Sequence, residues 1–200
     1  MGFIGVQPAT VPLTSSDITD GIITTAKIAD TAVSTAKIAD TAVSTAKIAD
    51  DAITVGKLPS GTVIQTVVST STANQVMTSS TYADIPSGGH QVTITPKLST
   101  SKILLMLTGT RISYTTTNGI SSLKIVRSID GASFTDVDEI EYEHYVQGAY
   151  AYSRSATLYD SPSTTTAVIY KVQGKSTGTG NAHYTYSGVP AVLTALEIKQ

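Results

Sequence analysis

The sequence predicts a mainly β protein in two parts: a repetitive segment, then a C-terminal antiparallel β-sandwich or jelly-roll domain. A ten-residue unit recurs between residues 25 and 58, and eight short β runs separated by turn residues follow it. Thr, Ser and Tyr are abundant while Trp is absent, a bias typical of strands. At 200 residues, the chain is long enough for one globular domain plus a smaller part.

The repeat keeps a strict register of bulky aliphatic residues. The unit TAVSTAKIAD occurs twice unchanged and again with small changes. Every fifth position along the segment carries Ile, Val or Leu, and these positions are Ile18, Ile23, Ile28, Val33, Ile38, Val43, Ile48, Ile53 and Leu58. A flexible linker seldom preserves such a register, so packing is favoured over a low-complexity linker, which stays an alternative.

A five-residue period does not fit a continuous helix or a flat strand. Five residues turn an α-helix by roughly 140°, which scatters the side chains, and an odd step along a strand alternates the face. A turn in each unit resolves the conflict, and we expect an extended piece around AVS followed by one turn of AKIAD, capped by Thr35 or Thr45. Alanines spaced 3, 3 and 4 leave a tightly wound left-handed coiled coil as the alternative.

The repeat segment is too thin to bury its own aliphatic side chains. A few such units in one chain form a column with no interior, so the expected partner is the same segment in parallel copies. We therefore expect the register positions to form the core of an oligomeric shaft.

After the turn-rich Pro59-Ser60-Gly61, short β runs replace the repeat. Asp130-Gly131 predicts a hairpin turn. The expected strands cover 62–69, 81–85, 91–95, 102–112, 122–129, 165–173, 182–187 and 191–198.

Composition excludes several classes of partner. The net charge of -2 and the lack of a basic block argue against nucleic acid. Cysteine is absent, which excludes disulfides and thiolate metal sites. No stretch predicts a secretory signal or a membrane span. We therefore expect that the chain is made in a cytoplasm and does not insert into a membrane.

Several stretches resemble one family. GTVIQTVVSTST, VTITPKLSTSKILLML, LYDSPSTTTAVIYKVQ and the closing LTALEI are similar to the C-terminal module of tail-fibre-like, receptor-binding appendage proteins from marine and cyanobacterial phages. The AKIAD repeats also resemble fibre shafts of such phages. The resemblance covers roughly residues 20–113 and 157–198 and leaves about 130–156 without a counterpart.

The resemblance implies a homotrimeric, non-enzymatic fibre of the virion, assembled in the host cytoplasm. Residues 1–20 would attach to another virion protein, 21–60 would form the shaft, and 61–200 would form a tip that binds a glycan or protein of the host surface. A head fibre that decorates the capsid is one alternative, because a shaft of about four repeats is short. A tail-associated polysaccharide depolymerase is the second.

A tyrosine-rich stretch between residues 138 and 154 is the candidate receptor contact. Tyrosine rings stack on sugars while hydroxyl and carboxylate groups bind sugar hydroxyls. The alternative is that these tyrosines line the core or a subunit interface. The candidate residues are Tyr142, Glu143, His144, Tyr145, Tyr150 and Tyr152.

The same region is rich in acids, which the depolymerase alternative would use as paired carboxylates. Such chemistry needs two carboxylates about 5 to 10 Å apart with one raised pKa, and a solvated acidic strand is the simpler interpretation. The acids are Asp136, Asp138, Glu139, Glu141 and Glu143. His90, His144 and His183 are isolated in the sequence, so we expect no metal and no cofactor, leaving open a histidine at a trimer axis.

Overall fold

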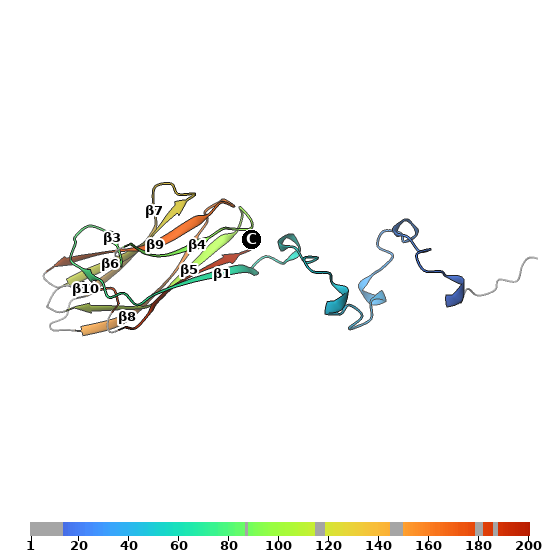
Figure 1. Ribbon diagram of the computed structural model, residues 1–200, viewed down its shortest axis with the longest axis horizontal. Helices are drawn as coiled ribbons and strands as arrows, with labels where there is room; N and C mark the ends of the chain where they lie inside the picture. The colour runs from blue at the N-terminus through green and yellow to red at the C-terminus, as the bar shows by residue number, and fades with distance from the viewer. Residues whose placement is uncertain (1–13, 87, 115–118, 145–149, 179–181, 186–187) are drawn as a thin grey trace, which may run out of the picture. The chain divides into compact units, whose positions relative to one another are not determined.

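The computed structural model describes residues 14–86, 88–114, 119–144, 150–178, 182–185 and 188–200. The chain divides into two units, Met1–Ile53 and Thr54–Gln200 (Figure 1). From residue 14 on, the first unit consists of repeats, and the regular elements of this described part are the 3₁₀ turns Ser15–Asp17, Thr25–Lys27, Thr35–Lys37 and Thr45–Lys47. A last turn of the same kind, Val55–Lys57, belongs to the second unit.

The second unit is built from two antiparallel sheets. The six-stranded sheet has the order β1-β11-β5-β10-β2, and β8 pairs with β5. Its strands are β1 (Val63–Ser71), β2 (Val76–Met77), β5 (Lys102–Tyr114), β8 (Tyr150–Asp160), β10 (Ala182–His183) and β11 (Ala191–Ile198).

The five-stranded sheet has the order β3-β9-β6-β7, and β4 pairs with β9. Its strands are β3 (Ala83–Asp84), β4 (His90–Ile94), β6 (Gly119–Ile129), β7 (Thr135–His144) and β9 (Val168–Gly178). The expectation of a mainly β chain with antiparallel sheets is confirmed.

Alternate side chains of both sheets meet in one core. Leu105 of β5 and Leu193 of β11 come from the six-stranded sheet, while Leu123 of β6 and Tyr170 of β9 come from the other, and all four are fully buried. Burying an aliphatic side chain of this size contributes about 1.5–3 kcal/mol. The period-2 alternation in these strands therefore supplies the hydrophobic stabilisation of the unit.

Charged groups are also held inside the second unit. Asp160 accepts hydrogen bonds from the Arg127 guanidinium and the Tyr170 hydroxyl, which links the end of β8 to the five-stranded sheet. The buried Glu197 carboxylate accepts from the Lys97 backbone N–H at 2.8 Å and from Gln65 Nε2 at 2.6 Å. These partners replace the water that a buried carboxylate loses.

Six predicted strands correspond to strands of the structure, namely 62–69, 91–95, 102–112, 122–129, 165–173 and 191–198. Asp130 and Gly131 have φ of 51° and 75°, and the Ala132 N–H donates to the Ile129 carbonyl, so the predicted hairpin turn is confirmed. The predicted runs 81–85 and 182–187 are too long, because β3 and β10 each cover two residues. No run is predicted at β2, β7 or β8, so these three strands were missed.

Candidate functional site

Each repeat contains two turns. In the unit around Ile38, the Lys37 N–H donates to the Ser34 carbonyl at 2.9 Å, and the Ile38 N–H donates to the Thr35 carbonyl at 3.2 Å. Ile38 is extended, with φ -102° and ψ 108°. The Ala42 N–H then donates to the Ala39 carbonyl at 3.0 Å, which closes a second turn. The expectation of a turn in each unit is confirmed, although the unit has two turns instead of one.

The second turn repeats a left-handed residue every ten positions. A positive φ at the third residue of a hydrogen-bonded four-residue turn is the pattern of a type II turn. Glycine adopts it at both ends of the series, whereas β-branched threonine does so in the middle at a steric cost. The positions are Gly21, Thr31, Thr41, Asp51 and Gly61, with φ of 81°, 66°, 66°, 63° and 87°.

The repeat lysines connect the two turns. Lys37 Nζ donates to the Ala32 carbonyl at 2.7 Å, five residues earlier. Lys27 and Lys47 make the equivalent bonds to Ile22 and Ala42 at 2.8 and 3.0 Å. Each of these lysines satisfies a carbonyl of the preceding turn, so the AKIAD signature has a direct conformational role.

The predicted capping residue is wrong by one position. The extended residue before the turn is Ser34 or Ser44, while Thr35 and Thr45 are the first residues of the turns. Ser34 and Ser44 make no side-chain cap hydrogen bond. A three-residue 3₁₀ turn uses its few backbone groups in i to i+3 bonds, which leaves little for a capping side chain to satisfy.

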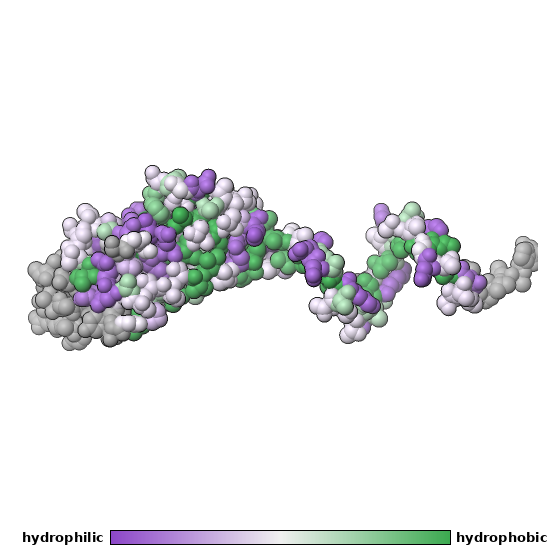
Figure 2. Space-filling view, viewed as in Figure 1, coloured by the Kyte–Doolittle hydropathy of each residue, from purple (hydrophilic) through white to green (hydrophobic). Residues whose placement is uncertain are grey.

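The register residues are exposed in the single chain. Leu58 is partly buried, and the other eight are at least 39% exposed. Figure 2 shows hydrophobic residues at the surface of the repeat segment. The exposed fractions are Ile18 47%, Ile23 55%, Ile28 44%, Val33 58%, Ile38 44%, Val43 56%, Ile48 39% and Ile53 56%. A regular series of exposed large aliphatic residues is typical of an interaction surface.

The last repeat is fixed to the end of β11. The Gly61 N–H donates to the Lys199 carbonyl at 2.7 Å, and the Lys199 N–H donates to the Thr62 carbonyl at 2.9 Å. Lys199 Nζ donates to the carbonyls of Gly56 and Leu58. The turn Val55–Lys57 is therefore held by the six-stranded sheet through main-chain and lysine hydrogen bonds.

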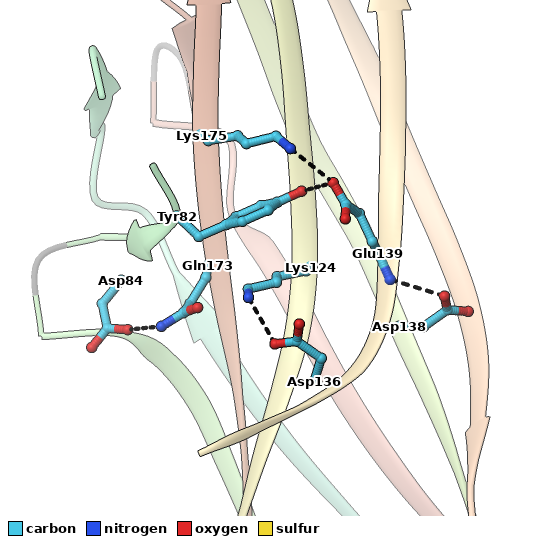
Figure 3. Close-up of polar contacts among 8 residues, drawn as sticks. All are labelled: Tyr82, Asp84, Lys124, Asp136, Asp138, Glu139, Gln173 and Lys175. Carbon is cyan, nitrogen blue, oxygen red and sulfur yellow. Dashed lines mark hydrogen bonds and ion pairs between the residues drawn. The ribbon is translucent and has the colours of Figure 1, made fainter. Parts of the chain in front are cut away.

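The outer face of the five-stranded sheet carries a polar cluster around Tyr82 (Figure 3). The ammonium groups of Lys124 and Lys175 each lie 4.5 Å from the centroid of the Tyr82 ring. The Tyr82 hydroxyl donates to Glu139 Oε1, and Lys175 Nζ lies 3.0 Å from the same oxygen. Lys124 Nζ also binds Asp136 Oδ1 at 2.7 Å.

The protonation of this cluster follows from these contacts. Burial, followed by the hydrogen bond to Glu139, raises the pKa of Tyr82 to about 12. The Tyr82 hydrogen bond and then Lys175 lower the pKa of Glu139. Glu139 is therefore ionised at neutral pH, whereas a general acid of a glycoside hydrolase needs a raised pKa. Asp138 Oδ1 accepts from the Glu139 backbone N–H at 2.9 Å.

A second aromatic group lies on the five-stranded sheet. Lys171 Nζ lies 3.9 Å from the centroid of the exposed Phe134 ring. Lys171 and Gln173 bind the two oxygens of Asp84 at 2.7 and 2.8 Å. Rings, amides, cations and carboxylates are thus presented together on this face, a combination able to bind hydroxyl groups.

The candidate receptor residues lie near one end of the second unit. Tyr142, Glu143 and His144 end β7, and Tyr142 pairs with Ser121 of β6. Tyr150 and Tyr152 begin β8, and Tyr150 pairs with Tyr114 at the end of β5. At ~3.3 Å per residue, β5 separates this end from Lys102, near the last repeat, by about 40 Å. Tyr145 and the side chains of the other five lie outside the described residues, as does the side chain of Glu141.

Two histidines with described side chains have separate structural partners. His90 is buried, its Nδ1 lies 2.8 Å from the Tyr184 hydroxyl, and its Nε2 lies 3.0 Å from the Ser69 carbonyl. Burial lowers the pKa of His90. His183 Nδ1 lies 2.9 Å from Asn74 Oδ1. In the described part of the chain, no three His, Asp or Glu residues gather as metal ligands.

The described ranges contain neither an enclosed pocket nor a membrane-spanning helix. These residues form no pocket. They also include no helix with the length and hydropathy needed to cross a bilayer.

Comparison with known proteins gives low similarity. No family model matches the chain, and no curated protein matches it. One structural match is a chain in the structure of infectious bursal disease virus, Gx strain, with a TM-score of 0.31 and 15% identity over 68% of this chain and 38% of that chain. Another is the enzymatically active domain of tailspike protein 4 of bacteriophage CBA120, with a TM-score of 0.26 and 13% identity over 68% of this chain and 20% of that chain. Neither score establishes a common fold.

Proposed function

We propose that the chain is a structural fibre protein of a virion, that it forms a parallel homotrimer through its repeats, and that its β domain adheres to the host surface. The observation that carries the proposal is the exposed register of the repeat segment. Eight of its nine aliphatic positions stay at least 39% exposed in one chain, although the backbone around them is regular. A regular structure that leaves its aliphatic side chains in water needs a partner, and a parallel copy supplies the same spacing.

Adhesion by such a fibre depends on several weak contacts acting together. Three copies of one binding surface convert a weak single contact into a strong combined one. Two surfaces are available for this contact: the end of the β domain that carries Tyr142 and Tyr150, and the aromatic and charged face around Tyr82 and Phe134. Their chemistry suits a surface glycan or a polar protein surface. In this proposal residues 1–20 attach to another virion protein and the chain is not an enzyme.

Competition for adsorption tests the adhesive function. The purified full-length chain in excess should lower the adsorption of virions to host cells, and it should bind those cells without releasing oligosaccharides. The variant Ile38→Asp, weakened in trimerisation, is the matched control and should compete less well because it loses multivalency. A trimeric wild-type chain that neither binds the cells nor competes would contradict adhesion, and released oligosaccharide would favour a depolymerase.

A further inference from the structure

The two sheets of the β domain have outer faces of different chemistry. On the six-stranded sheet, one cross-strand row places Thr66, Leu196, Leu104 and Tyr159 side by side, and the next places Val68, Thr194, Met106 and Thr157 side by side. A further row pairs Thr70, Val192 and Thr108. These eleven side chains are aliphatic, aromatic or hydroxyl-bearing, and all of them are uncharged.

This uncharged face is accessible in the single chain. Tyr159 is 64% exposed and Val68 is 55% exposed, while Leu104, Met106 and Leu196 are partly exposed. Along a strand of an antiparallel sheet, the side chains that face water are usually polar. Figure 2 shows hydrophobic residues along β1 toward the last repeat and hydrophilic residues over β3 and β6.

The five-stranded sheet, by contrast, is unsuited to contact with a copy of itself. Its outer face carries Lys124, Lys171 and Lys175 with Glu139 and Asp84. Identical copies brought together there would bury several charged pairs, each at a desolvation cost. The three uncharged rows of the six-stranded sheet have no such cost, and the charged Lys102 lies at their edge beside Ile198. Charge therefore favours the six-stranded sheet for self-association.

Continuity with the last repeat also selects this sheet. The last repeat is hydrogen-bonded to the start of β1 and the end of β11 through Gly61, Thr62 and Lys199. When the repeats of three chains associate, these two strands of each chain are brought together. Strands β1 and β11 contribute six of the eleven uncharged positions, so the face begins where the repeat ends.

We propose that the outer face of the six-stranded sheet, around Val68, Leu104, Met106 and Leu196, is buried against the neighbouring copies of the β domain, an inference that rests on the proposed homotrimer. Four strands spaced ~4.8 Å apart and about seven residues long present roughly 400 Å². A stable interface needs about 800 Å² from each partner, so the repeats must supply the remainder. The charged face of the five-stranded sheet then stays in solvent.

Single cysteines test this surface directly, because the natural chain contains none. Full-length Val68→Cys and Thr194→Cys place a thiol on the uncharged face, and Gln173→Cys is the matched control on the other sheet. Val68 is more exposed in one chain than Gln173 is, so a free subunit would react with maleimide at least as fast at position 68. In the trimer we expect alkylation at positions 68 and 194 to be at least about tenfold slower than at 173.

The mass of each variant in solution distinguishes failure of the proposed interface from failure of the proposed homotrimer. Slow alkylation at positions 68 and 194 in a chain of trimeric mass supports the interface. Equal rates at all three positions in a chain of trimeric mass would overturn the interface and leave the homotrimer intact. A monomeric mass for the wild-type chain would overturn both.

Discussion

Ile38 offers a direct measure of what the repeat register contributes. It is 44% exposed in the single chain, and full burial of such a side chain is worth about 1.5–3 kcal/mol. Covering the exposed part in a trimer therefore contributes about 1 kcal/mol per chain, or about 3 kcal/mol per trimer. Ile38→Ala should weaken the trimer association constant by about a hundredfold, since each 1.4 kcal/mol is a factor of ten.

Ile38→Asp should have a larger effect than Ile38→Ala. It adds the cost of burying three carboxylates near one another at the trimer axis, several kcal/mol in total. The assay is sedimentation equilibrium over a concentration series, with thermal unfolding followed by circular dichroism. Asp40→Ala, an exposed substitution in the same repeat, is the control and should change stability by less than about 0.5 kcal/mol. If Ile38→Asp unfolds and dissociates like the wild type, the shaft reasoning is refuted.

Three further substitutions test local features by thermal or denaturant unfolding. Thr41→Gly should stabilise the repeat by up to about 1 kcal/mol, because glycine adopts the φ of 66° without the steric strain of threonine. Ser44→Gly, at φ -87°, is the control and should destabilise the repeat by a few tenths of a kcal/mol. Stabilisation by both substitutions would contradict the turn geometry. Gly109 lies where the β5–β8 pairing shifts register between Leu107 and Thr110, a β-bulge. Gly109→Ala should cost about 2 kcal/mol or more, since Gly109 has φ 71° and a Cβ would lie 2.3 Å from the Pro190 carbonyl oxygen; an unchanged midpoint would argue against this bulge. Burial lowers the pKa of His90 in the folded chain, so below pH 6.5, the ordinary pKa of histidine, the unfolded state binds a proton that the folded core disfavours. The free energy of unfolding should therefore decrease as the pH is lowered below 6.5, and His90→Gln should flatten this slope.

The alternating strands could be predicted from the sequence because one face of each is buried. In β11 the residues Ala191, Leu193, Ala195 and Glu197 point into the core with period 2, and the run was predicted over the same residues. The Asp-Gly dipeptide likewise predicts its turn, because both residues adopt positive φ.

The miss at β7 has a physical explanation. β7 is an edge strand whose acids Asp136 and Glu139 point outward to Lys124 and Lys175 of β6 and β9. Acidic residues are depleted in strands, so the intrinsic propensity of this segment argues against a strand. The strand is stabilised by pairs between its acids and lysines of the neighbouring strands, which propensity does not include. The polar cluster around Tyr82 was missed for a similar reason, because its members come from four separate segments of the chain.

The repeat shows both what a sequence period determines and what it leaves open. The five-residue register indicated that each unit must turn. The position of the turns depends on backbone bonds and on the contact of each lysine with a carbonyl five residues earlier, and neither has a distinct signal in a sequence of Thr, Ala and Ser.

The mass of the purified full-length chain in solution tests the central claim most directly. Light scattering coupled to size-exclusion chromatography should give three copies of the 20.8 kDa chain, about 62 kDa, at micromolar concentration. A mass of 20.8 kDa that persists as the concentration is raised would contradict a fibre built from three parallel chains.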